Sequence, residues 1–162
     1  MLRSPPVLLV LVLACVPVGI GAASRLWSAL ASDWNATPDT VALVTGVLSA
    51  LIGAVGSVAG GAIAVRFGRW IAFLGAGGLM ALIALVMAAS PRAPEVYVAG
   101  VLLYALMFGL ANAGFGSVVL HAIGRRAASA KIATFWSLGN VPTVYLVAFD
   151  GWMYDHFGAR EC

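Results

Sequence analysis

Charged side chains are scarce in this chain. Only 9% of its 162 residues are Asp, Glu, Lys or Arg, whereas ordinary soluble domains carry about a quarter. The mean hydropathy is correspondingly high, at +1.02. So little charge and so much apolar sequence exclude a water-soluble fold, because the apolar surface must face lipid.

Cysteine and clustered reactive groups are scarce as well. Cys15 lies inside an apolar run and Cys162 is the last residue, so the two give neither a disulfide framework nor metal-ligand spacing. The sequence offers no Ser/His/Asp grouping, no facing pair of carboxylates and no phosphate-binding loop. The basic residues are scattered among short loops. We therefore expect no enzyme activity, no cofactor, no metal site and no nucleic-acid partner.

Long apolar runs are what the sequence has in abundance. A membrane-spanning helix needs about 20 such residues. The runs are continuously apolar rather than alternating, which favours helices over a β-barrel. The sequence predicts an all-α membrane protein, with residues 1–162 as a single membrane domain of five transmembrane helices. Their approximate ranges are residues 7–30, 41–65, 70–89, 96–122 and 132–154.

The distribution of Lys and Arg between alternate loops predicts the orientation. With a cytoplasmic N-terminus, six basic residues fall on the inner side: Arg3, Arg66, Arg69, Arg125, Arg126 and Lys131. Three fall on the outer side: Arg25, Arg92 and Arg160. This bias agrees with the positive-inside rule. The first run is too long for a signal peptide, whose apolar region is about 7–15 residues. We expect a multi-pass protein of the cell (inner/plasma) membrane, with its N-terminus in the cytoplasm and its C-terminus outside.

Glycines recur at helical spacing in two of the predicted spans. The second span contains Gly46, Gly53, Gly56, Gly60 and Gly61, and the fourth contains Gly100, Gly109, Gly114 and Gly116. Small residues three and four apart form a flat face that another helix can approach closely. In the fourth span the glycines also predict a helix that can bend or break locally.

The end of the second span carries the most specific motif. Residues 61–69 read Gly-Ala-Ile-Ala-Val-Arg-Phe-Gly-Arg. This stretch resembles the signature loop of the major facilitator superfamily, Gly-x-x-x-Asp-Arg-x-Gly-Arg. Val65 stands where the family has an acid, so a gate latch at this loop is expected to be weak or absent. We expect Gly61 to permit close helix contact and Gly68 to turn the chain, and Arg66 and Arg69 to lie in the cytoplasmic headgroup layer.

A second copy of this frame closes the fifth span. Gly151, Asp155 and Gly158 repeat the Gly-x-x-x-Asp-x-x-Gly pattern, directly after Asp150. The second and fifth spans are three helices apart, so they are expected to end on opposite membrane faces. An inverted repeat of three plus three helices has this arrangement.

The resemblance extends along most of the chain. Residues 18–27, 137–142 and 150–152 are similar to the C-terminal halves of bacterial major facilitator proteins, in particular the muropeptide permease and acetyl-CoA transporter group. The resemblance implies an incomplete six-helix half, corresponding to the seventh through eleventh of twelve helices. The final helix and the N-terminal half are then expected from a partner or from self-association. It also implies secondary active transport of a small solute, with a proton as a candidate coupling ion.

Polar residues inside spans are candidates for a substrate cavity, because they are expensive in lipid. The candidates are Arg25, Tyr104, Asn112, Asn140 and Tyr145. For the asparagines the alternative is an amide bond between helices, and for the tyrosines it is packing. Arg25 and Asp150 are expected near the outer interface, either paired or reaching separately to water.

A second class of function stays open. A non-transporting structural or assembly subunit would use the glycine faces to bind another membrane protein, and it would need no central polar residues. Convergence of Arg25, Asn112 and Asn140 on one water-accessible cavity would distinguish the transporter from the assembly subunit.

Overall fold

The computed structural model describes residues 24, 27–123, 133–134, 136–138 and 140–157. Nearly all of these residues are helical, and none of them forms a strand. Three helices are long and apolar enough to cross a membrane: Pro38–Arg66, Arg69–Ala89 and Pro94–His121. The all-helical prediction and the second, third and fourth predicted spans are confirmed at this level.

Short helices come first in the described part of the chain. Helix α2 (Trp27–Leu30) continues into the 3-10 helix η2 (Ala31–Trp34), which ends at Asn35 in the left-handed conformation, with φ 54°. Helix α3 (Pro38–Ala42) begins at Thr37, whose hydroxyl accepts a hydrogen bond from the Thr40 amide. Proline at the first helical position supports this start, since it needs no amide partner there. Most of the first predicted span, 7–30, lies outside the described residues.

The second span changes its helical pitch partway along. After α3 the chain forms a π-helical segment, η3 (Leu43–Leu48), and then α4 (Ser49–Arg66). Thr45 and Ser49 donate their hydroxyl hydrogens to the carbonyls of Val41 and Val44, each at 2.7 Å. Hydroxyls bonded to the preceding turn bend helices. They account for a distortion here, where Gly46 also weakens the regular α-helix.

The next two spans are regular. Helix α5 (Arg69–Ala89) follows a tight turn at Gly68, whose φ of 105° favours a residue without a side chain. The prediction that Gly68 turns the chain is confirmed. Helix α6 (Pro94–Ile123) runs unbroken for 30 residues. The expectation of a local break at its glycines is wrong, and their role in the packing explains why.

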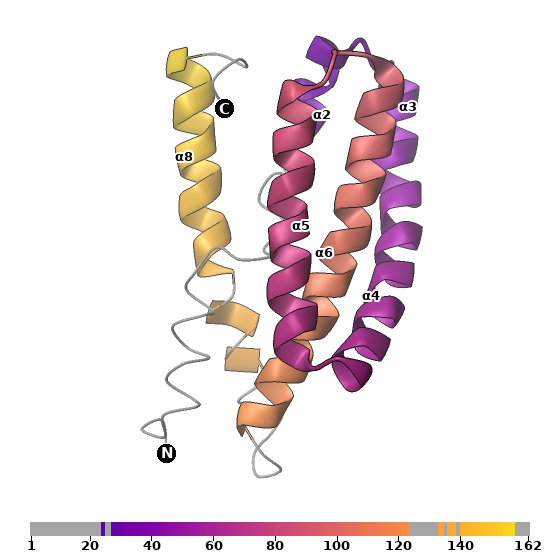
Figure 1. Cartoon of the computed structure of the whole chain (residues 1–162). Helices are drawn as coiled ribbons and strands as arrows, with labels where there is room; N and C mark the ends of the chain where they lie inside the picture. Colours follow the sequence, from indigo (N-terminus) through magenta and orange to yellow (C-terminus); the bar gives the residue numbers. More distant parts are fainter. Residues whose placement is uncertain (1–23, 25–26, 124–132, 135, 139, 158–162) are drawn as a thin grey trace.

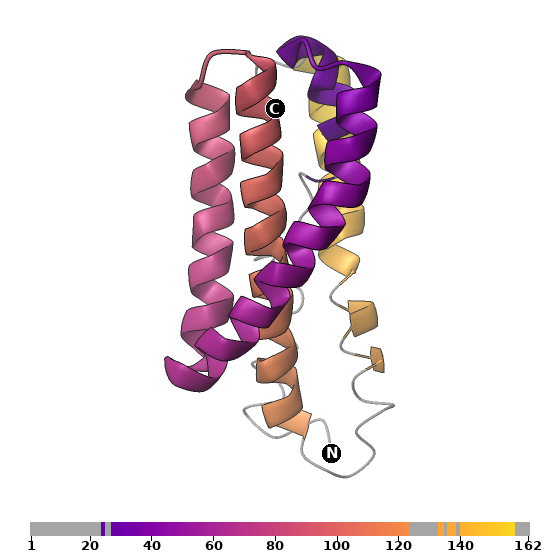
Figure 2. The ribbon, with the colours of Figure 1, turned by 90° about the vertical axis from the view of Figure 1, so that its right-hand side faces the viewer.

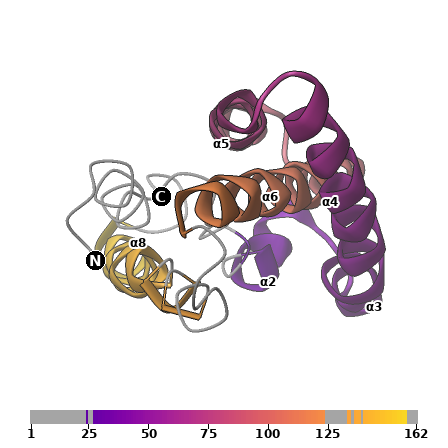
Figure 3. The ribbon, with the colours of Figure 1, turned by 90° about the horizontal axis from the view of Figure 1, so that it is seen from below.

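Helix α6 is the centre of the bundle. Seen along the helices, it lies between α8 (Val141–Phe157) and the pair α4 and α5 (Figure 3). Much of the buried core belongs to α6, including Tyr97, Val101, Ala111 and Val119. The outer faces of α4 and α5 stay apolar and exposed, with Val58 77% and Leu85 68% accessible. Such a surface suits contact with lipid tails.

Glycines bring α4 and α6 into direct backbone contact. A Cβ added at Gly56 would meet the Leu106 carbonyl oxygen, and one at Gly109 would meet the Gly53 carbonyl oxygen. At Gly60 the added atom would lie 2.7 Å from the Leu110 carbonyl oxygen. The predicted small-residue face is therefore real, but α6 of the same chain occupies it.

The glycines of α6 serve two neighbours. Gly109 faces α4, whereas a Cβ at Gly114 would lie 2.7 Å from the Phe73 amide nitrogen on α5. They permit close packing and leave the helix intact. At Gly61 an added Cβ would meet no atom within 4 Å. The expectation that Gly61 makes a close helix contact is therefore wrong within the described residues, and its neighbour Gly60 has that role.

The fifth predicted span differs at its start. It was expected over residues 132–154, but Asn140 lies in a turn and α8 begins at Val141. Proline suits the first turn of a helix, and Pro142 stands there. At about 1.5 Å per residue, the 17 residues of α8 extend for roughly 26 Å, slightly less than the apolar core of a bilayer. Helices α4 and α8 end at opposite ends of the bundle (Figure 1).

Candidate functional site

A pocket of about 260 Å³ lies between α2, the segment from η3 to α4, and α6. In the ribbon, α4 leans away from α6 above the level at which the two helices cross (Figure 2). Residues 45–50 lie roughly 10–18 Å along their helix from Pro38, and residues 101–108 lie roughly 10–21 Å along α6 from Pro94. The pocket thus lies roughly 10–20 Å along these helices from the ends at which they begin.

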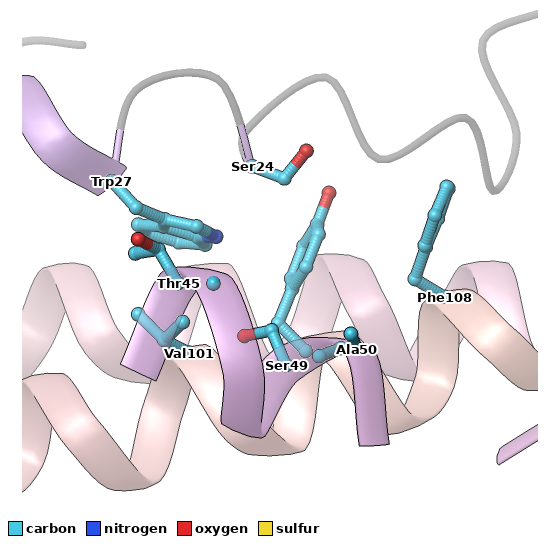
Figure 4. A pocket seen from close by; sticks show the side chains of 10 residues that line it. Ser24, Trp27, Thr45, Ser49, Ala50, Val101 and Phe108 are labelled. Carbon is cyan, nitrogen blue, oxygen red and sulfur yellow. The ribbon is translucent and has the colours of Figure 1, made fainter. Parts of the chain in front are cut away.

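Hydroxyl groups line one part of the pocket. They belong to Ser24, Thr45, Ser49 and Tyr104. Thr45 belongs to η3 and Ser49 is the first residue of α4 (Figure 4), and Gly46 also lines the pocket. π-helical segments occur frequently at functional sites. Here the segment brings two hydroxyl oxygens to the wall of one pocket.

Aromatic rings form the rest of the wall. Trp27 and Phe108 lie towards opposite ends of the pocket, with Ser49 and Ala50 between them (Figure 4). The Trp27 ring packs edge-on against Tyr104, with centroids 5.4 Å apart and planes at 82°. This geometry is favourable for aromatic pairs. The described lining contains no charged side chain.

Two contacts between distant segments lie near the Trp27 end of the site. The fully buried Tyr97 donates its hydroxyl hydrogen to the Trp27 carbonyl oxygen at 3.0 Å. A nitrogen of Arg92 lies 3.8 Å from a carboxylate oxygen of Asp33. The first contact fixes the backbone that carries the Trp27 ring. The second is a partly exposed ion pair and contributes little.

The predicted cavity residues do not all converge. Tyr104 is buried and lines the pocket, as expected. Asn112 is half-buried on α6 and does not line it. Asn140 is exposed and donates its amide hydrogen to the Trp136 carbonyl oxygen at 3.0 Å. Tyr145 is 45% exposed on α8. Arg25 lies outside the described residues.

The two loop frames are placed at helix ends. Arg66 ends α4, with its guanidinium 5.7 Å from the centre of the Phe67 ring, and Arg69 begins α5. In the second copy, Asp150, Gly151 and Asp155 are helical positions of α8. Gly158 lies outside the described residues, as does Arg25, the proposed partner of Asp150.

The sequence-based search missed most of the pocket. Four lining residues are not among the predicted cavity residues: Trp27, Thr45, Ser49 and Phe108. The prediction included only amide, tyrosine and charged side chains inside the spans. One signal was available in the sequence: Thr45, Gly46 and Ser49 form a cluster of polar and small residues on one stretch of an apolar span. Such a cluster predicts a local distortion.

The pocket and the fold were compared with known proteins. Comparisons with protein families, with curated proteins and with solved structures found no match.

Proposed function

We propose that the chain is a helical part of a secondary transporter, which moves a small solute across the cytoplasmic membrane. The observation that supports this proposal is the pocket between apolar helices, which is lined by hydroxyl-bearing and aromatic residues; in the proposal this pocket lies near the bilayer midplane. Transporters bind substrate near this level, at helices with irregular backbone. The π-helical segment beside Thr45 and Ser49 is a feature of this kind.

The loop frame supports a half-transporter of the major facilitator type. Gly68 makes the tight turn that the signature loop requires, and Arg66 and Arg69 flank it. The frames at the ends of α4 and α8 lie at opposite ends of the bundle, as an inverted repeat needs. In this proposal the N-terminus is cytoplasmic.

One observation favours the assembly-subunit alternative, because Asn112 and Asn140 do not meet at the pocket. This alternative relies on glycine faces that are free to bind another protein. Gly56, Gly60 and Gly109 instead make contacts between α4 and α6 of one chain. The same glycines therefore stabilise the bundle that encloses the pocket.

Alternating access provides a test that needs no known substrate. Ala50 lines the pocket, so we would introduce Ala50→Cys into a chain carrying Cys15→Ser and Cys162→Ser. A membrane-impermeant maleimide is then applied to right-side-out and to inside-out vesicles. A transporter pocket opens to each side in turn, so Ala50→Cys should be labelled in both preparations. Labelling from one side only, or from neither, would contradict transport.

Two matched variants make the labelling interpretable. Phe67→Cys lies at the turn between α4 and α5, and Pro91→Cys lies in the loop between α5 and α6; both native residues are exposed. Each should react from a single side, Phe67→Cys from the cytoplasm and Pro91→Cys from outside. The pair verifies that the reagent stays on its side, and the reverse result would overturn the proposed orientation.

A further inference from the structure

The hydroxyls of Thr45 and Ser49 determine what the pocket can bind. Each hydroxyl has one hydrogen, and each donates it to a carbonyl of its own helix at 2.7 Å. What each oxygen still offers to a ligand is its lone pairs. The η3 wall of the pocket therefore presents hydrogen-bond acceptors, and a ligand contacting this wall must supply donors.

The aromatic rings set a second requirement. The rings of Trp27, Tyr104 and Phe108 line the space beside Ser49 and Ala50, and flat apolar groups pack well against such rings. The volume of about 260 Å³ is slightly below the range for drug-sized ligands, which is roughly 300–1,000 Å³. The ligand is therefore small, with a flat apolar body and a donor group at one edge.

Charge sets the third requirement. The described lining has no acid or base that could neutralise an ion. Removing an ion from water without a counter-charge costs more than contact with aromatic faces offsets. An uncharged ligand is favoured for this reason. Arg25 follows the lining residue Ser24 in the sequence and lies outside the described residues. Because arginine pairs with anions, the test includes an anionic probe.

We propose that this pocket binds an uncharged small molecule that donates hydrogen bonds to Thr45 and Ser49 and places a flat apolar group against the aromatic rings of the pocket wall. The proposal rests on the transport function, because it names the class of solute for the same site. Benzamide is a suitable probe, since it combines a flat ring with an uncharged amide that has two N–H donors. Three relatives with the same ring serve as comparisons: N,N-dimethylbenzamide lacks the donors and is bulkier, benzamidinium keeps the donors but is a cation, and benzoate is an anion without donors.

The experiment measures how strongly each probe slows maleimide labelling of Ala50→Cys in vesicles. Benzamide should protect the cysteine at millimolar concentration. The loss of a hydrogen bond should make N,N-dimethylbenzamide about threefold to tenfold weaker. Benzoate and benzamidinium should protect less than benzamide. Equal protection by the dimethyl compound would overturn the role of the donors, and stronger protection by either ion would overturn the uncharged class.

Substitutions link the protection to the two hydroxyls. Thr45→Val and Ser49→Ala remove the acceptor oxygens, and each should weaken protection by benzamide about threefold to tenfold. Ser117→Ala is the matched control, because Ser117 donates to the Ala113 carbonyl at 2.9 Å and does not line the pocket. It should leave protection unchanged. Unchanged protection in both pocket variants would overturn the proposed contacts, and the probe series on Ala50→Cys alone remains decisive if a variant fails to fold.

Failure of this inference and failure of the transport proposal give different results. Labelling from both sides without protection by benzamide would overturn the ligand class and leave transport supported. Protection by benzamide with labelling from one side only would support the ligand class and contradict transport.

Discussion

The two halves of the α4 and α6 contact have opposite characters. At the crossing, glycines place backbone against backbone, as at Gly56 and Gly109. Above the crossing α4 leans away from α6 (Figure 2), and Trp27, Tyr104 and Phe108 are among the residues that line a pocket between the second span and α6. The size of the side chains determines the separation of the helices. One helix pair therefore combines a rigid crossing with an open site.

This contrast explains why glycines of one helix can differ in role. Gly46 lines the pocket, and an added Cβ there would meet nothing within 4 Å. Gly56 lies at the crossing, where an added Cβ would meet backbone. Substitutions at the two positions should affect different properties of the protein, one its site and the other its stability.

The largest expected effect is on access to the pocket. Gly46→Leu should place an apolar side chain in the pocket without a clash, so the chain should still fold. Labelling of Ala50→Cys in this variant should fall to the rate of the cysteine-free chain. The matched control is Gly61→Leu, since Gly61 also has open space but does not line the pocket. Unchanged labelling in Gly46→Leu would show that Ala50 is reached by another route.

The next effect is on stability. Gly56→Ala forces a methyl group against the Leu106 carbonyl, and overpacking of this kind costs about 1–3 kcal/mol. Gly61→Ala adds the same group in open space, where removing a glycine from a helix stabilises by up to about 1 kcal/mol. Unfolding by sodium dodecyl sulfate in mixed micelles, followed by tryptophan fluorescence, measures both. Equal midpoints for the two variants would contradict the tight crossing.

The spans could be predicted from the sequence because they depend on a local quantity. The run predicted over 70–89 became α5 at Arg69–Ala89, and the run over 96–122 became α6 at Pro94–Ile123. Hydropathy and length decide whether a helix can cross lipid. The start of α8 was less predictable, because the turn at Asn140 interrupts a run that is still apolar.

The partners of the glycines could not be predicted. The sequence indicated a small-residue face, but only the position of α6 decides that Gly60 is in contact while Gly61 is open. The residues that line the pocket could not be predicted for the same reason. Thr45 and Ser49 are common residues in apolar helices, and their significance depends on the π-helical pitch and on Trp27 from another segment.

The smallest expected effect concerns a side-chain hydrogen bond that joins α4 to α6. Among the described residues, the Ser57 hydroxyl lies 3.0 Å from the Gly53 carbonyl oxygen and 3.2 Å from that of Gly109. Its single hydrogen is shared between the two carbonyls, and bonds between helices in lipid average about 0.6 kcal/mol. Ser57→Ala should therefore lower the free energy of unfolding by about that amount in the same micelles. Ser117→Ala removes a bond to its own helix only and should have a smaller effect. Equal losses would show that close glycine packing holds the crossing and that the Ser57 bridge adds nothing to it.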